Sequence, residues 1–536
     1  MTEEEKALAR KGPASYQAAD IAFLASAKAP LNANHPGTGK TPEWIGAVWE
    51  AGLEQGCHLV IAPTAAVDGT WEEELAKWQA DAPVSVEIFA CTGTRTQREA
   101  TLESFERSTA PVRWVVVNPA MVQYRKDKHF FADDFIELAK DKDWEAACKC
   151  IVNKKPHWHY ESTYPILHST TWTTINIDES HKGSVRNHKT ITAKALNDLR
   201  VASTGKKAAS SGTPMKKKGA DLWGTLHYLR PDVFSSYWRF AEGFFEIDDN
   251  GYGKKVGKLR RDREREFFRM LSPYMLRRTK AECLPWLPPK QFIPVWCVMG
   301  SKQEAQYKAM EEEGAARLGS IEITTTSILA EMTRLKQFST ALCKVSKDGK
   351  VVPTDVSCKL DRLLETMEDQ GMFDEGNTEK QLVFSQSRQV VDWVAAHLEM
   401  RGLKVEKITG GQGAQGQRKA IKDRFQNGDT RVLCIVTTAG GVSLTLDAAD
   451  VAHFMDEMWS PEESEQTEDR LHRASRNHQV RIYQYRTKGT IEEAIQETAM
   501  GKQEAQEFIL DVRRQLLAKY ASKGSRPARH ARKART

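Results

Sequence analysis

The sequence lacks the features that mark membrane and secreted proteins. No apolar run reaches the ~18 residues that a membrane-spanning helix needs. Residues 1–6 are acidic and contain no apolar segment of the kind found in a secretory signal. The 9 cysteines are odd in number and follow no disulfide framework. We therefore expect a protein of the cytosol or nucleus with reduced thiols.

The sequence also has little excess of charge. The formal net charge of +6 permits a nucleic-acid partner but does not by itself indicate one. Of the 536 residues, 40% are hydrophobic, which excludes wholesale disorder. There is no repeat of solenoid length and no group of residues typical of a nuclease or methylase. Since one core rarely exceeds roughly 250–300 residues, we expect more than one folded domain.

Short β-branched runs predict the fold class. Longer helix-prone stretches separate these runs, a pattern typical of parallel sheets covered on both faces. The runs fall into two groups, which predicts an α/β protein with two parallel-sheet lobes and a helical region between them. The predicted strands include 59–62, 114–117, 175–177, 382–384 and 432–436.

The two groups of strands set the expected domain boundaries. We expect an N-terminal lobe at 1–235, a helical insertion or linker at 236–354, and a C-terminal lobe at 355–515. The last residues, 516–536, are basic, and from Lys519 onward they contain no acidic side chain. This tail is expected to be disordered, and it can serve as a nucleic-acid tether or a localisation signal.

The strongest local motif is a phosphate-binding loop that ends in Gly-Lys-Thr. Glycines let backbone N–H groups surround a phosphate, and the following helix adds the positive end of its dipole. Lys40 is expected to reach the terminal phosphates, and the Thr41 hydroxyl to hold Mg²⁺. Asn34 stands where the usual pattern has glycine. The residues expected to bind the nucleotide here are Pro36, Gly37, Thr38, Gly39, Lys40 and Thr41.

A second motif places two acids directly after a predicted buried strand. Unpaired carboxylates are costly to bury, so Asp178 and Glu179 make little sense as structural residues. Beside a phosphate they suit catalysis. We expect Asp178 to hold the metal through its water shell and Glu179 to orient the attacking water.

A third motif lies near the end of the second lobe. The spacing of Gln466, Arg470 and Arg473 predicts that they share one face of a helix. They can be the polar side of an exposed helix. Alternatively, the arginines are fingers that meet the γ-phosphate when the lobes close. Either role stays open on this motif alone.

Further motifs follow in a fixed order between about Ser15 and Ile495, and together they resemble the Swi/Snf family of double-stranded DNA translocases in helicase superfamily 2. The block at 276–290, with Leu276-Arg277-Arg278-Thr279-Lys280 and Leu287-Pro288-Pro289-Lys290, is characteristic of that family. Ala474-Ser475-Arg476 departs from the family's usual Ile-Gly-Gln. Because no accessory domain is evident, the chain is similar to compact bacterial or bacteriophage members. The other matching segments begin at Tyr16, Pro63, Ser211, Asp221, Leu229, Val383, Thr438, Trp459, Tyr483 and Gly489.

The resemblance implies two RecA-like lobes, ATP and Mg²⁺ as cofactors, and double-stranded DNA as a partner without strong sequence preference. It implies that Gln17 reads the adenine. It also implies a cytoplasmic protein, in the host cytoplasm if a phage encodes it. A strand-separating DNA or RNA helicase and a non-hydrolysing DNA-binding scaffold are the alternatives. The residues implied to approach the nucleic-acid backbone are Thr64, Trp71, Ser385, Gln386, Thr437 and Gly441.

One inserted segment, at 125–172, has no counterpart among these motifs. It contains Cys148, Cys150, His157 and His159, which are residue types that bind zinc. Each pair is separated by one residue, whereas zinc sites usually leave two to four. An inserted loop with lysines near DNA is therefore the favoured interpretation.

Overall fold

Contacts within the computed structural model divide the chain into two units, Met1–Cys283 and Leu284–Thr536. Residues 236–354, expected to lie between the lobes, contribute elements to both units. The structure describes residues 15–128, 140, 158–182, 185, 187–215, 219–249, 253–318, 325–345, 351–409, 417–437, 446–458, 461–473 and 478–499.

The first unit is built on a seven-stranded sheet in which every pair of neighbours is parallel. The strand order is β11-β1-β8-β7-β2-β4-β3. The predicted strands at 59–62, 114–117 and 175–177 correspond to β2, β4 and β7. The strands are β1 (Leu31–Asn32), β2 (Gly56–Ile61), β3 (Val86–Ala90), β4 (Val112–Val117), β7 (Trp172–Ile177), β8 (Val201–Ser210) and β11 (Met275–Leu276).

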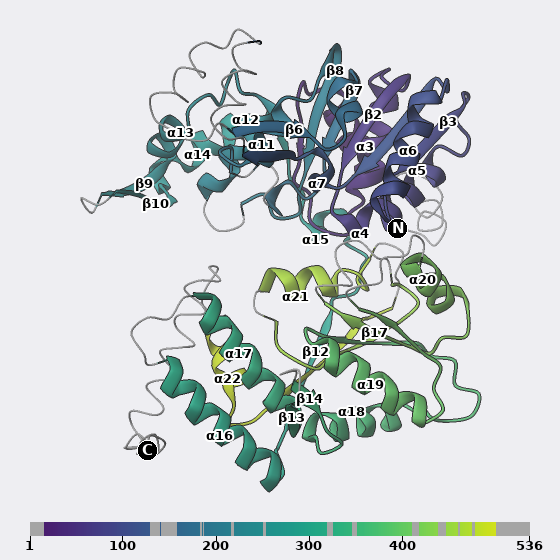
Figure 1. Cartoon of the computed structure of the whole chain (residues 1–536), viewed down its shortest axis with the longest axis vertical. Coiled ribbons are helices and arrows are strands. Elements are labelled where there is room, and N and C mark those ends of the chain that lie inside the picture. Colours follow the sequence, from purple (N-terminus) through teal and green to yellow (C-terminus); the bar gives the residue numbers. More distant parts are fainter. Residues whose placement is uncertain are drawn as a thin grey trace. The chain divides into compact units, whose positions relative to one another are not determined.

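Helices cover both faces of this sheet (Figure 1). Alternate residues of β2 enter two different cores, Leu59 and Ile61 in one and Val60 in the other, as the period of a strand requires. One face carries α2 (Ser15–Ser26), α3 (Lys40–Glu50) and α5 (Glu72–Trp78). The other carries α6 (Arg95–Arg107), α7 (Pro119–Val122), α10 (Pro165–Ser169), α11 (Ile191–Asn197) and α12 (Leu222–Leu229).

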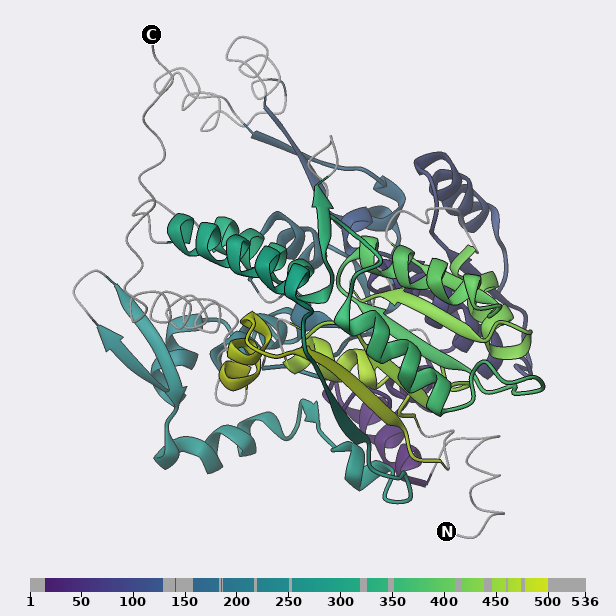
Figure 2. The ribbon, with the colours of Figure 1, turned by 90° about the horizontal axis from the view of Figure 1, so that it is seen from below.

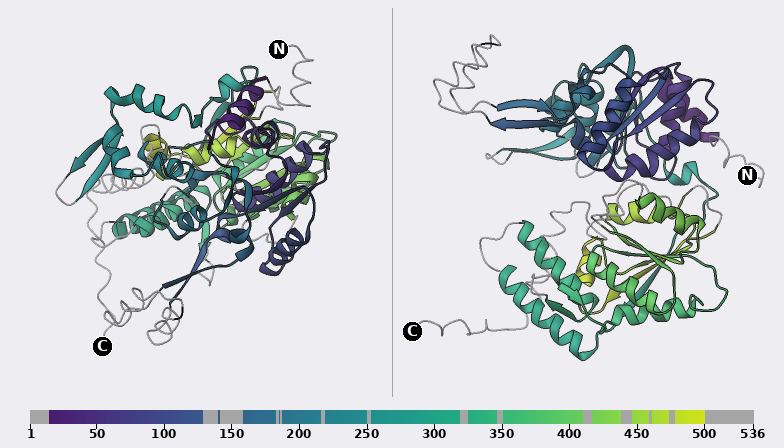
Figure 3. Two further views of the ribbon diagram at one scale, coloured as in Figure 1. Left: turned by 90° about the horizontal axis from the view of Figure 1, so that it is seen from above. Right: turned by 45° about the vertical axis from the view of Figure 1, so that its right-hand side comes forward.

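Two antiparallel strand pairs stand away from the sheet of the first unit (Figures 2 and 3). They are β5 (Tyr124–Lys128) with β6 (Trp158–Ser162), and β9 (Phe245–Asp249) with β10 (Lys254–Leu259). The remaining elements of this unit are α4 (Thr64–Ala66), the π-helix η1 (Val67–Trp71), η2 (Ser180–Lys182), η3 (Gly219–Asp221), α13 (Tyr237–Phe244), η4 (Arg261–Arg263), α14 (Glu264–Leu271) and α15 (Lys280–Cys283).

The second unit contains a six-stranded parallel sheet in the order β12-β19-β18-β15-β17-β16. Pro294 lies in β12, the edge strand, where its missing N–H leaves no ladder bond unmade. The strands are β12 (Gln291–Cys297), β15 (Gln381–Ser385), β16 (Val405–Ile408), β17 (Val432–Val436), β18 (Val451–Phe454) and β19 (Arg481–Thr487).

Helices again pack on both faces, because Val383 of β15 enters one core and Leu382 and Phe384 the other. A third core joins the paired helices α16 and α17 to α22. The elements are α16 (Ser301–Leu318), α17 (Thr325–Thr340), β13 (Cys343–Val345), β14 (Val351–Pro353), α18 (Cys358–Asp369), α19 (Arg388–Met400), α20 (Gln417–Asn427), α21 (Pro461–Glu468) and α22 (Ile491–Ala499).

The prediction of an α/β fold with two parallel sheets is confirmed. None of the helices in the described ranges is long and apolar enough to cross a membrane.

Candidate functional site

Three of the predicted motifs meet at one edge of the first sheet. Strands β1, β8 and β7 are neighbours and run parallel, so their carboxyl ends lie side by side. The phosphate loop follows β1, Asp178 follows β7, and the segment beginning at Ser211 follows β8. A Cβ atom on Gly212 would lie 2.7 Å from Cγ of Pro36, which shows how closely two of these loops pack.

The phosphate loop has the backbone that its glycines predict. Gly37 and Gly39 have φ angles of 77° and 91°, in the left-handed region that other residues avoid. Helix α3 begins at Lys40, directly after Gly39. The Lys40 ammonium donates to the carbonyls of Asn34 at 3.0 Å and His35 at 3.2 Å. The Lys40 ammonium therefore lies against the phosphate loop, where it is predicted to reach the terminal phosphates.

Helix α2 packs its polar end against this loop. The Tyr16 hydroxyl donates to the carbonyl of Thr38 at 2.5 Å, and the Gln17 amide lies 3.4 Å from the carbonyls of Thr38 and Gly39. A Cβ atom on Gly39 would lie 2.3 Å from the Gln17 nitrogen. Gln17 therefore lies beside the phosphate loop, and its adenine-reading role stays a prediction.

Asn34, the departure from the usual loop pattern, is fully buried and ties the loop to the end of the first unit. Its amide donates to Asp20 at 2.9 Å and to Glu43 at 3.2 Å, and its oxygen accepts from the Arg278 backbone at 2.7 Å. Asp20 in turn pairs with the Arg278 guanidinium at 2.6 Å. Arg277 donates to the carbonyls of Ala33 and Gly212. The Asn34 side chain makes hydrogen bonds to three other residues, and a glycine at this position could not make them.

Glu43 in the first turn of α3 is a buried carboxyl group. Asn32 donates to its Oε2 at 2.6 Å, while Oε1 has no hydrogen-bond partner among the described residues. Burial raises the pKa of Glu43 to about 8, against the lowering effect of the Asn32 hydrogen bond. The group therefore titrates near neutral pH.

Asp178 is held by donors from two different elements. The indole N–H of Trp71 donates to Oδ2 at 3.0 Å, and the Ser210 hydroxyl donates to Oδ1 at 2.9 Å. Withdrawal from water, and then the charge of Glu179, raises the pKa of Asp178. Glu179 has a φ angle of 50°, the only positive φ of a non-glycine residue in the described ranges. Such strain persists only where the surrounding structure enforces it, often at functional sites.

His181 links this acidic pair to the loop after β8. Its Nδ1 lies 2.8 Å from the Ser211 hydroxyl and 3.2 Å from Oε2 of Glu179. The same hydroxyl oxygen accepts from the backbone N–H of Thr213. The acidic motif and the following loop are thus connected by side-chain contacts.

The oxygens at this edge fit the magnesium ion that the motifs imply. Mg²⁺ prefers hard oxygen ligands and keeps several waters, and Thr41 and Asp178 supply a hydroxyl and a carboxylate. Both oxygens of Asp178 already accept hydrogen bonds, which suits contact through the metal's water shell. Over the described ranges, no group of three or more His, Cys, Asp or Glu side chains forms a ready-made metal cage.

The residues implied to approach nucleic acid differ in exposure. Thr64 is exposed at the start of α4. Trp71 is 1% exposed and points to Asp178 instead of solvent. Ser385 is also buried, and its hydroxyl donates to Asp456 at 2.5 Å. Gln386 and Thr437 are half-buried, and Gly441 lies outside the described residues.

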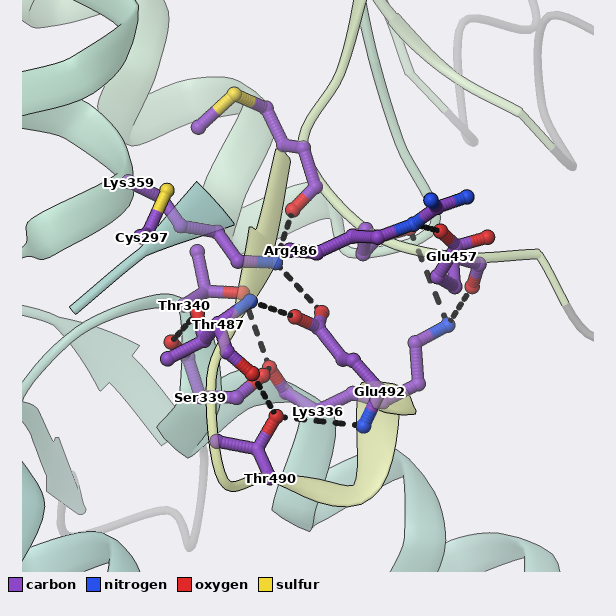
Figure 4. A network of polar contacts seen from close by, with 12 residues as sticks. Cys297, Lys336, Ser339, Thr340, Lys359, Glu457, Arg486, Thr487, Thr490 and Glu492 are labelled. Carbon is purple, nitrogen blue, oxygen red and sulfur yellow. Dashed lines mark hydrogen bonds and ion pairs between the residues drawn. The ribbon is translucent and has the colours of Figure 1, made fainter. Parts of the chain in front are cut away.

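Figure 4 shows a polar network in the second unit that includes Lys336, Lys359 and Glu492. Lys336 of α17 donates to the Gln386 side chain and to the carbonyl of Glu457. The fully buried ammonium of Lys359 pairs with Glu492 at 2.5 Å and donates to a carbonyl at the end of β18. Lys336 of α17 therefore contacts the loop that follows β15, whereas Lys359 of α18 contacts the residue that follows β18.

The prediction that one helix carries Gln466, Arg470 and Arg473 is wrong. Helix α21 ends at Glu468; Arg470 lies in the turn that follows, and Arg473 lies beyond that turn. Lys290 bonds Glu468 and Asp469 at 2.9 Å each, which holds the chain where the helix ends.

Arg470 itself is 5% exposed, and two of its guanidinium nitrogens have no acceptor among the described residues. Burial, and then the charge of Arg473, lowers the pKa of Arg470 to about 10. A cation with unused donors suits an anionic ligand.

Two other predictions concern residues whose structure is not described. Cys148, Cys150 and His157 lie outside the described residues, and so does the basic tail. His159 falls in β6. The zinc hypothesis and the role of the tail stay predictions.

Comparisons with known proteins give a consistent picture. Residues 16–343 match the model of the SNF2-related domain, and residues 358–475 match that of the helicase conserved C-terminal domain. The "Probable ATP-dependent DNA helicase CHR23" of Arabidopsis thaliana is 25% identical over 524 residues, which cover 92% of this chain and 43% of that protein. The "ISWI chromatin-remodeling complex ATPase ISW1" of Saccharomyces cerevisiae is 24% identical over 531 residues, which cover 95% of this chain and 41% of that protein.

Among solved structures, the Sulfolobus solfataricus SWI2/SNF2 ATPase core in complex with dsDNA is 22% identical, with a TM-score of 0.38 and coverage of 95% of this chain and 93% of that one. The chain spans less than half the length of the two curated relatives named above.

Proposed function

Because the chain belongs to the SNF2-related family, also called Swi/Snf, we propose that it is a DNA-dependent ATPase that moves along double-stranded DNA. One observation supports this most directly. The phosphate loop, the Asp178–Glu179 pair and the loop after β8 lie together at the carboxyl edge of one parallel sheet. In open α/β sheets, this edge is where ligands bind.

The proposed roles follow from chemistry at that edge. Lys40 and the N-terminus of α3 bind the phosphates of ATP, and Gln17 reads the adenine. Thr41 and Asp178 hold Mg²⁺, which neutralises phosphate charge when bound. Glu179 orients and polarises the attacking water.

In the second unit, Gln466, Arg470 and Arg473 are proposed to complete catalysis. An arginine finger stabilises charge on the transferred phosphoryl group and can supply roughly 10³–10⁵ in rate. The unused donors of Arg470 support this role.

The proposed track is the phosphate backbone of duplex DNA. Thr64, Gln386, Thr437 and Gly441 are the proposed contacts. Ser385 and Trp71 are proposed to act indirectly. Ser385 acts through its hydrogen bond to Asp456, and Trp71 acts through its hydrogen bond to Asp178. Backbone contact implies weak sequence preference and an affinity that falls steeply with salt.

ATP turnover measured with duplex DNA, single-stranded DNA, RNA and no nucleic acid tests this proposal. We expect duplex DNA to stimulate turnover most. Lys40→Ala, which removes one phosphate-facing ammonium from a half-buried position, should abolish turnover and leave the circular dichroism spectrum unchanged. Greatest stimulation by RNA would indicate an RNA helicase instead. Absence of turnover with every nucleic acid would indicate a scaffold.

A further inference from the structure

Trp71 lies on the segment that begins with Thr64, a proposed DNA contact, yet its side chain faces the catalytic edge. The segment consists of α4, η1 and α5, and it begins directly after β2. Thr64, its first residue, is exposed, whereas Trp71 is 1% exposed and packs in the core behind the sheet. A single short segment therefore joins a surface position to a buried one.

The contact between Trp71 and Asp178 is specific. The indole Nε1 donates to Oδ2 of Asp178 at 3.0 Å. The other donors to this carboxylate, the Ser210 hydroxyl and the Glu179 backbone N–H, both bind Oδ1. Of the described residues, Trp71 is thus the donor that fixes Oδ2.

The helix geometry explains how Trp71 reaches this position. Between Val67 and Trp71 the helix widens to a π turn, and the N–H of Glu72 donates to the carbonyl of Val67 five residues earlier. The wider turn accommodates one extra residue and changes the direction of the side chains that follow it. Such π turns are uncommon and are frequent at functional sites.

We propose that Trp71 is a positioning residue that couples nucleic-acid contact at Thr64 to the setting of Asp178 for Mg²⁺. This inference rests on the proposed function. Any shift of α4 on binding a duplex changes the position of the indole N–H, and with it the orientation of the carboxylate. Groups that hydrogen-bond a metal-binding carboxylate orient it and tune its affinity for the metal.

The chain offers a matched control on the same segment. Trp78 donates its indole N–H to Glu74 at 2.7 Å, at a half-buried position away from Asp178. Trp71→Phe and Trp78→Phe therefore delete the same atoms and one hydrogen bond each. Ser210→Ala removes a donor to Asp178 from outside the segment.

The test has two readouts. The first is binding of a fluorescent ATP analogue over a Mg²⁺ series, and the second is the ratio of turnover with and without duplex DNA. We expect Trp71→Phe to need about ten- to hundredfold more Mg²⁺ and to lose most of the duplex stimulation. Ser210→Ala should raise the Mg²⁺ requirement but keep the stimulation ratio. Trp78→Phe should match the wild type in both.

Wild-type behaviour of Trp71→Phe in both readouts would overturn the inference. If Trp71→Phe does not fold, benzothienylalanine at position 71 keeps the ring shape and replaces the N–H with sulfur. The same two readouts then decide the matter. A wild-type protein without duplex stimulation would instead contradict the proposed function, while the Mg²⁺ comparison between Trp71→Phe and Trp78→Phe would still test whether Trp71 positions Asp178.

Discussion

At the scale of single residues, Glu179 combines a strained backbone with a proposed role that needs accurate placement. A φ of 50° is costly for a residue with a side chain, and the contact with His181 helps to hold it. A carboxylate held in this way can orient a water molecule without reorganising during the reaction.

Glu179→Gln keeps the shape of the side chain and removes the base. Since Lys40, Thr41 and Asp178 remain, we expect the variant to bind ATP as tightly as the wild type. We expect its steady-state turnover to fall by at least about a hundredfold, the scale of one general base. Equilibrium binding and turnover are measured on the same preparation. Loss of nucleotide binding would contradict the role assigned to Glu179.

Glu43 predicts a pH dependence of stability. Its pKa in the folded chain, about 8, lies above the ordinary value of 4.5, so folding favours the protonated carboxyl. The contribution of Glu43 to the free energy of unfolding is complete below about pH 4.5 and is lost as the pH rises through about 8. In Glu43→Gln, which stays neutral, this loss should be absent. Melting temperatures of both proteins between about pH 5 and pH 9 should therefore diverge as pH rises. Parallel profiles would exclude Glu43 as the source.

The sequence predicted which residues meet at this site but not what holds them. Lys40, Asp178 and Glu179 carry motifs whose chemistry requires a shared ligand, and the structure brings their loops to one edge. The supporting contacts of Ser210, Arg277 and Asn34 depend on which loops become neighbours. No local sequence pattern shows which loops become neighbours.

At the scale of elements, the strands rich in β-branched residues could be predicted from the sequence, whereas β8 lacks that pattern. Its residues Lys206 and Lys207 suggest exposure, yet the Lys206 ammonium donates to the carbonyls of Leu24 and Ala25 at the end of α2. A lysine that caps a helix can occupy a central strand, but the sequence cannot show that a helix end lies there. Similarly, the sequence cannot show that Lys290, distant in sequence, binds Glu468 and Asp469 where α21 ends.

The helices of the second unit depend on the buried pair Lys359–Glu492. Removing one partner leaves an uncompensated buried charge, so Lys359→Met should cost about 3–5 kcal/mol of unfolding free energy. Lys359→Met combined with Glu492→Gln should cost clearly less, because no charge remains. Denaturant titrations of the full chain measure both.

The exposed pair Lys404–Asp429 provides the control for that measurement. Water screens this pair, so Lys404→Ala should leave the unfolding midpoint unchanged. Equal effects of Lys359→Met and Lys404→Ala would show that burial does not matter for this network.

At the scale of the whole molecule, two parallel-sheet units each carry one part of the predicted machinery. The phosphate loop and acidic pair belong to the first unit, and Gln466, Arg470 and Arg473 belong to the second. The proposed function therefore predicts that full turnover needs side chains from both units.

The central claim, movement along duplex DNA without strand separation, is tested most directly by a triplex-displacement assay run beside a forked-duplex assay. We predict that the protein with ATP displaces the third strand from a triplex and leaves the fork paired. Displacement should stop with Glu179→Gln and weaken as salt rises, because the contacts are to phosphates. Efficient unwinding of the fork with no displacement of the third strand would contradict the account and indicate a strand-separating helicase.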